Sequence, residues 1–290
     1  MRFLSPFFAV LASLALLYST PVLAAAAATV EAVKSPAWRD RGGVTVPLAA
    51  GMELKSGDVL RTGSGARAYL ILAEGSRVKL GEAVQFTFYS QSLRPEKSFR
   101  GALEIVAGAF RFTTAKLKKA LPREVAIRVG TATIGIRGTD IWGKTDKDGD
   151  LVALLEGRIE ITRAGQATEL AQPMTYFDAP SGQAAEVKPL DLETFVKLAR
   201  QTEIMAGDGA ARARGKWRVL AGTAASEEAA LELYDRIREA GFAARIRPRA
   251  AAGGGWTYEL RLAGYSSAAE AEVAAARLQA ATRLKPTVGR

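Results

Sequence analysis

Hydrophobic and polar residues alternate in many short runs between residues 44 and 161, and glycines stand between most of the runs. A period of two places the apolar side chains on one face of a β-strand. Many short strands separated by turn residues are typical of all-β folds. We therefore predict that residues 29–180 form an all-β domain: a sandwich, a jelly roll or a short β-solenoid. The predicted strands cover residues 44–48, 68–72, 77–80, 84–88, 103–106, 109–112, 125–129, 139–142, 151–155 and 158–161.

The pattern changes in residues 181–215. Between residues 189 and 206, apolar side chains recur at helical spacing among charged ones and predict an amphipathic helix. They are Leu192, Phe195, Val196, Leu198 and Ala199. Residues 207–215 are rich in glycine and arginine and predict a flexible, basic linker. A domain boundary is expected there.

Residues 216–290 predict the order strand, helix, strand, strand, helix, strand, which is an α+β split-βαβ (ferredoxin-like) domain. The strands are expected near residues 217–222, 242–246, 256–262 and 287–288. Ser226 begins the first helix, whose apolar stripe is Ala230, Leu233, Tyr234 and Ile237. A capping box of Ser267 and Glu270 begins the second. Its inward residues are expected to be Ala269, Val273, Ala276 and Ala280.

With both helices on one side of this sheet, alternate strand residues face inward or outward. The inward set is Val219, Ala221, Phe242, Ala244, Ile246, Leu260 and Leu262. The outward set, on an uncovered face, is Arg218, Leu220, Arg245, Arg247, Thr257, Glu259 and Arg261. Several arginines with few carboxylates suit an anionic ligand.

The N-terminus predicts export. Arg2 supplies a positive charge, residues 3–17 are mostly apolar, and small residues end at Ala24. This is the pattern of a signal peptide over residues 1–24, cleaved near Ala24. The apolar run is shorter than the ~20 residues that span a bilayer. The expected mature protein is periplasmic, with no stable membrane insertion.

The amino-acid composition limits the kinds of catalytic and metal-binding site that the chain can form. The chain has 40 Lys plus Arg and 30 Asp plus Glu, a net charge of +10, and neither His nor Cys. Ser-His and Cys-His nucleophiles are therefore excluded, zinc loses its preferred ligands, and we expect no cofactor. The charge favours a polyanionic partner. Nucleic acid is not expected, because the chain is exported and lacks a base-stacking platform. A carboxylate-based glycan hydrolase stays open as a less favoured alternative, since it needs only two acidic residues.

The string TIGIRGTD at residues 133–140, with LKSGD at residues 54–58 and VLRTG at residues 59–63, resembles the FecR domain family over about residues 50–165. The resemblance implies an extracytoplasmic β domain that mediates interactions. Gly135 and Gly138 are expected at a bend or a close strand approach, and Arg137 is expected to pair with Asp140 or Glu156. The acidic run at residues 146–150 is expected to be a hairpin turn rather than a calcium loop.

Residues 216–290 resemble the SPOR family through WRVLAG at residues 217–222, YELRLAGY at residues 258–265 and SSAAEA at residues 266–271. The resemblance implies binding to peptidoglycan glycan strands. The binding residues are expected to be Arg218, Leu220, Arg245, Arg247, Arg261 and Tyr265. Leu220 and Ala224 depart from the glutamine and the aromatic residue that family members often carry at these positions.

The sequence therefore predicts a non-catalytic periplasmic protein of the cell envelope. Its SPOR-like domain would bind peptidoglycan, and its FecR-like domain would meet a ligand or an envelope protein. The alternative is a signalling or regulatory protein that acts through a membrane partner of the FecR-like domain.

Overall fold

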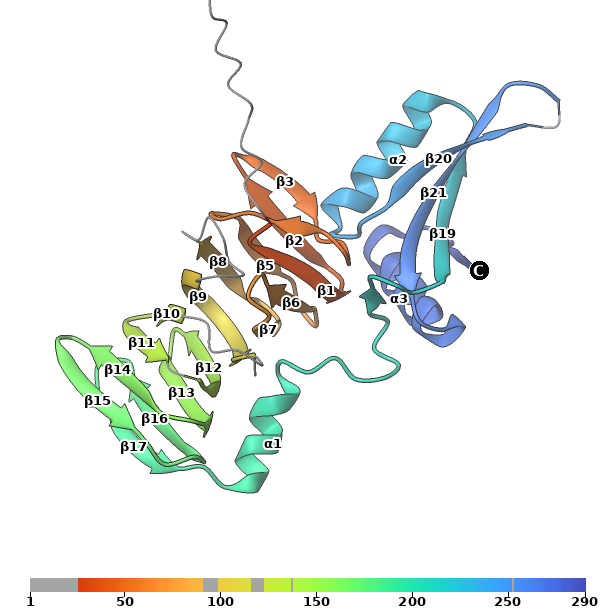
Figure 1. Cartoon of the computed structure of the whole chain (residues 1–290). Coiled ribbons are helices and arrows are strands. Elements are labelled where there is room, and N and C mark those ends of the chain that lie inside the picture. The colour runs from red at the N-terminus through yellow and green to blue at the C-terminus, as the bar shows by residue number, and fades with distance from the viewer. Residues whose placement is uncertain (1–25, 91–98, 116–122, 137, 252) are drawn as a thin grey trace, which may run out of the picture.

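The computed structural model describes residues 26–90, 99–115, 123–136, 138–251 and 253–290. It contains a β domain, a short helix with a connecting segment, and a C-terminal α+β domain (Figure 1). The predicted signal peptide lies outside the described residues. Within the described part of the chain, no helix is long and apolar enough to cross a membrane.

The β domain is a sandwich of two sheets, which selects one of the three predicted architectures. One sheet has β4 (Glu53–Leu54) at its edge, followed by β1 (Ala28–Lys34), β6 (Arg67–Leu72), β7 (Arg77–Leu80), the C-terminal half of β9 (Phe99–Thr113), β12 (Asp140–Asp146), β13 (Gly149–Glu156), β16 (Thr175–Pro180) and β17 (Glu186–Pro189). The other runs β3 (Val44–Pro47), β2 (Ala37–Arg41), β5 (Val59–Thr62), β8 (Gln85–Ser90), the N-terminal half of β9, β10 (Arg123–Val129), β11 (Ala132–Ile136), β14 (Ile159–Arg163) and β15 (Gln166–Leu170).

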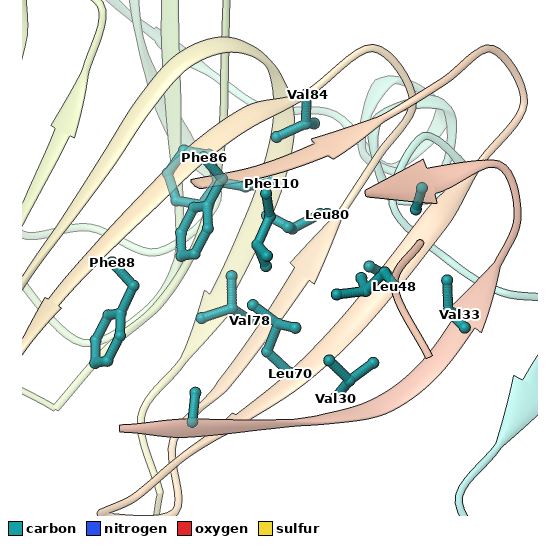
Figure 2. Close-up of a cluster of buried hydrophobic side chains, with 14 of the residues drawn as sticks. Val30, Val33, Leu48, Leu70, Val78, Leu80, Val84, Phe86, Phe88 and Phe110 are labelled. Atoms are coloured by element: carbon teal, nitrogen blue, oxygen red, sulfur yellow. The ribbon is translucent and has the colours of Figure 1, made fainter. Parts of the chain in front are cut away.

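Apolar side chains from both sheets meet in the interior (Figure 2). Val30, Leu70 and Val78 of the first sheet belong to the same buried cluster as Phe86 of the second. All four are 0% exposed. On the central strands the alternation in the sequence places these side chains inward, so hydrophobic burial holds the two sheets together.

The long strand β9 joins the two sheets. Its first half pairs with β8 and β10, and its last residues pair with β7 and β12. Gly108 lies at the crossing with φ +89°, and a Cβ there would approach Cγ2 of Val84 to 2.6 Å. The two runs predicted over residues 103–106 and 109–112 are therefore one strand, bent at a glycine that no larger residue can replace without strain.

The predicted amphipathic helix is α1 (Leu192–Arg200), which begins after the N-cap Asp191. Phe195 and Leu198 pack against Trp142 on the outer surface of the first sheet. Leu192 and Val196 of the same stripe are 70% and 41% exposed. The helix thus covers a small part of the sheet and leaves some of its own apolar face open.

A charged cluster fixes the chain directly after α1. Glu203 accepts hydrogen bonds from Nζ of Lys79 at 2.6 and 2.7 Å and from the Tyr69 hydroxyl at 2.8 Å. Partial burial of Glu203 raises the pKa of its carboxyl, but these bonds and the nearby positive charges outweigh burial and hold the pKa below its usual value. Arg111 lies 3.5 Å from Glu203 and forms a bidentate pair with Asp140.

The C-terminal domain has the predicted element order: β19 (Trp217–Ala224), α2 (Glu227–Glu239), β20 (Arg245–Ala250), β21 (Trp256–Tyr265), α3 (Ala268–Thr282) and β22 (Thr287–Gly289). The strand order in space is β22, β19, β21, β20, all antiparallel. Val219, Ala221, Leu260 and Leu262 are buried in the core that also contains residues of both helices.

Two local predictions for this domain were wrong. Phe242 and Ala244 precede β20 rather than lie in it. In α3 the buried residues are Ala271, Ala274, Ala275, Leu278 and Thr282, whereas Ala269, Ala276 and Ala280 are exposed. Alanine occupies most of this helix on all sides, so the sequence carries almost no amphipathic signal to define the inward face.

The segment predicted to be a flexible linker is tied to both domains. Within it, β18 (Ala211–Arg212) pairs with β1 of the β domain and with β21 of the C-terminal domain. The carboxylate of Glu270 accepts bonds from the backbone N–H groups of Gly207, Gly209 and Ala210 at 2.8, 2.5 and 3.1 Å. Glu270 therefore holds the linker instead of completing the predicted capping box.

Direct contacts between the domains add to this junction. The backbone N–H of Ala37 donates to the carbonyl of Gly241 at 3.2 Å, and Nη1 of Arg277 donates to the carbonyl of Ser35 at 3.2 Å. Nζ of Lys34 lies 2.9 Å from Oδ1 of Asp208. Since the two domains share backbone pairing and side-chain bonds, they are packed together rather than joined by a loose tether.

Candidate functional site: the open face of the C-terminal sheet

The uncovered face of the C-terminal sheet collects five of the six predicted binding residues. Leu220, Arg261 and Arg245 are paired across β19, β21 and β20. Directly paired residues of antiparallel strands point to the same face, and neighbouring strands lie about 4.8 Å apart. Arg247 follows two residues after Arg245 on the same face, and Arg218 is paired with Ala263 on β21.

The arginines of this face differ in availability. Arg245 and Arg247 are exposed, and neither has a hydrogen bond or an ion pair within the described residues. The Arg261 side chain is 19% exposed and is ion-paired with Glu259. Arg218 donates to the backbone carbonyl of Arg290. Arg245 and Arg247 are therefore the two cations best placed to meet a ligand.

Glu259 is a carboxylate that neutralises part of the positive charge of this face. It lies between Arg261 and Arg249, with Nε of Arg249 at 3.3 Å. Burial raises the pKa of the Glu259 carboxyl, but the bonds and charges of Arg249 and Arg261 outweigh burial and hold the pKa below its usual value. Glu259 is thus ionised at neutral pH and occupies the two arginines beside it, which leaves the β20 edge as the positive part of the face.

Tyr265, the sixth predicted binding residue, does not lie on this face. The residue is 4% exposed and belongs to the buried core. Gly264 adopts φ +101° immediately before it, and β18 then pairs with β21 at Tyr265. Burial raises the pKa of the Tyr265 hydroxyl, so the group stays neutral.

Two surface residues of this domain were missed from the sequence. Trp256 shares the inward direction of Leu260, yet it is 59% exposed. Trp256 is the first residue of β21, and the β20–β21 hairpin extends beyond the N-terminal end of α2 (Figure 1). Arg249 continues the alternate spacing of Arg245 and Arg247, and that spacing could have placed it on the open face.

In the β domain, the string at residues 133–140 forms β11 and the turn after it. Ile134 is fully buried, as its alternation predicts. Gly138 adopts φ +70°, which confirms the predicted bend, but a Cβ at Gly135 would meet nothing within 4 Å. The close strand approach predicted at Gly135 is therefore wrong. Arg137 lies outside the described residues, and Asp140 pairs with Arg111.

The acidic run at residues 146–150 forms the tight connection between β12 and β13, as predicted. Asp146 pairs with Gly149 across the hairpin and accepts a bond from the backbone N–H of Asp148 at 2.9 Å. Asp150 is 6% exposed and accepts bonds from Thr131. Across the described ranges, no three acidic side chains gather closely enough to hold a metal ion.

Family comparisons agree with this architecture. The FecR family, described as FecR protein, matches residues 58–160, and the SPOR domain family matches residues 213–288. No curated protein matches the chain in sequence.

Two solved structures are similar in part. Both are crystal structures described as a "putative anti-sigma factor" from Parabacteroides distasonis ATCC 8503, each 12% identical to this chain. One covers 67% of this chain and 94% of its own, with a TM-score of 0.39. The other covers 78% and 91%, with a TM-score of 0.41.

FecR-like and SPOR domains belong to non-catalytic binding and regulatory families of the cell envelope, and SPOR domains bind peptidoglycan. The chain carries a FecR domain over residues 58–160 and a C-terminal SPOR domain over residues 213–288.

Proposed function

We propose that this protein is a non-catalytic periplasmic component of the cell envelope. Its SPOR domain binds peptidoglycan glycan strands on the open face of the sheet, and its FecR domain is presented to a ligand or an envelope protein. The observation that carries the proposal is the pair Arg245 and Arg247, exposed side by side on β20 without a carboxylate partner among the described residues.

The chemistry of the face fits a glycan that carries carboxylates. A guanidinium forms two parallel hydrogen bonds with a carboxylate, and such charge-assisted bonds are stronger than neutral ones. Arg245 and Arg247 are separated by two residues of strand, about 6.8 Å, so they can meet two groups along one ligand. Leu220 and Ala224 replace the polar and aromatic side chains often found in the family, so the arginines carry more of the proposed binding.

The composition supports a binding role over catalysis. The absence of His and Cys removes the common nucleophilic and metal-based hydrolases. A glycosidase needs two carboxyl groups about 5 to 9.5 Å apart across the scissile bond. Within the described residues of β19, β20 and β21, the acidic side chain is Glu259 alone, and it is occupied by two arginines.

Co-sedimentation with purified sacculi tests the proposal. We expect the mature chain to sediment with sacculi, and the variant Arg245→Ala/Arg247→Ala to lose most of this binding. The matched control is Arg236→Ala/Lys285→Ala, which removes the same charge from exposed positions off the sheet strands. If both double variants lose binding equally, the net charge of the domain is responsible rather than the open face. If the unmodified chain stays in solution, the proposed function is wrong.

A further inference from the structure

A cavity of about 200 Å³ lies at the junction of the two domains. The β domain contributes Val33, Ser35 and the loop residues 48–50 to its wall, from the part of that domain before the FecR match, and the SPOR domain contributes Arg245 and residues 262–265. Residues 211–213 and Gly215 of the connecting segment complete it. Neither domain encloses this space by itself.

The lining has a defined chemical character. Arg212 and Arg245 are its charged residues, and no Asp or Glu lines it. Tyr265 also lines it and is 4% exposed, yet its hydroxyl has no hydrogen bond to a described residue. The hydroxyl oxygen is not one of the described polar atoms that are enclosed without a partner, so it is accessible to a molecule in the cavity. Since burial keeps this hydroxyl protonated, it can donate a hydrogen bond to an acceptor in the cavity.

The cavity borders the open face. Arg245 and Ala263 belong to the rows of that face and also line the cavity. A ligand bound at the β20 edge can therefore contact Arg245 and extend into the cavity between the domains at the same time. The volume equals the share of about seven water molecules and is below the ~300 Å³ of small ligand pockets, so a small substituent of the glycan fits there.

We propose that the junction cavity binds a carboxylate substituent of the glycan, such as the lactyl group of a muramic acid residue. This inference rests on the proposed function and adds that the β domain forms part of the glycan site. Arg245 pairs with one oxygen of the carboxylate, and the Tyr265 hydroxyl donates to its other oxygen. Residues 48–50 supply the opposite wall.

Calorimetry with stem-free glycan oligosaccharides tests the inference, using the full mature chain and the same oligosaccharides with methyl-esterified carboxylates. Tyr265→Phe removes the hydroxyl, and Ala50→Met fills the cavity from the β domain. We expect each to weaken binding of the free acid about tenfold, the equivalent of one charge-assisted hydrogen bond, and to leave the ester unaffected. Ala126→Met, at an exposed position outside the cavity, should change neither.

The outcomes separate the two proposals. If the unmodified chain binds the glycan and both variants bind the free acid as tightly as it does, the cavity proposal is wrong and the open face stands. If the unmodified chain binds no glycan, both are wrong. If Tyr265→Phe lowers the melting temperature, Ala50→Met decides: tenfold weakening with normal stability supports the cavity, and unchanged affinity overturns it.

Discussion

Replacing Glu203 by glutamine should weaken the attachment of the segment after α1 to the FecR domain. The carboxylate accepts two contacts from Lys79 and one from Tyr69, and Arg111 is nearby. Glutamine keeps the shape but loses the charge, and its amide NH₂ would face Lys79 as a donor facing a donor. The Glu203 and Lys79 side chains are 26% and 24% exposed, so the pair is neither buried nor fully solvated.

Burial sets the expected magnitude. Removing one partner of a buried pair costs about 3–5 kcal/mol, whereas exposed pairs contribute about 0.2–1 kcal/mol. Glu203 lies between these limits, so we expect Glu203→Gln to lower the free energy of unfolding by about 2 kcal/mol at pH 7. The matched control is Glu169→Gln. Its ion pair with Arg158 has the same 2.6 Å separation, but the side chains are 53% and 68% exposed. It should cost less than about 1 kcal/mol.

Urea unfolding of both variants at several pH values is the assay. The pKa of Glu203 is lower in the folded protein than its usual value of 4.5, so the unfolded chain takes up the proton first as the pH falls. The contribution of Glu203 is therefore fully present above about pH 5.5 and is lost as the pH falls through the folded-state pKa below 4.5. The difference between the unmodified chain and Glu203→Gln should shrink in that window. Equal costs for the two variants, or a difference that does not shrink in acid, would refute the reasoning.

Two further substitutions test the junction and the sandwich. Glu270→Gln should speed hydrogen exchange of the amides of residues 207, 209 and 210 about tenfold, because a carboxylate that accepts three N–H bonds is lost. The control Glu272→Gln, exposed on the same helix, should leave the exchange of those amides unchanged. Equal exchange rates in both variants would contradict the role of Glu270 in holding this segment. Gly108→Ala should lower the melting temperature and the free energy of unfolding, the latter by at least ~1 kcal/mol, because of the positive φ at Gly108 and its close approach to Val84. The control Gly135→Ala has open space around its Cβ and should change the free energy of unfolding little. A similar loss of stability in both variants would argue against the role of Gly108 in bending β9.

The alternation of residues in the C-terminal domain was sufficient to predict its element order and the face on which Arg218, Leu220, Arg245, Arg247 and Arg261 lie. The same was true of Ala230 and Ile237, which α2 buries at 0% exposure. These predictions were correct because apolar residues recur in the sequence with the period of the strand or amphipathic helix that they form. In the alanine-rich helix α3 the sequence shows no contrast between an apolar and a polar face, so the inward face could not be predicted.

The amino-acid sequence alone established the element order of the C-terminal domain and the face that carries Arg245 and Arg247, it excluded chemistry that needs His or Cys, and its motifs indicated the two domain families. The tertiary structure was needed to establish that Tyr265 is buried, that Trp256 is exposed, and that residues 207, 209 and 210 are bound to Glu270. The physical reason is that burial and hydrogen bonding of these residues depend on partners distant in sequence: Glu270 is about 60 positions from the amides that it holds, and β18 joins strands from both domains. Local periodicity records which way a side chain points, and it carries no information about which distant segment covers it.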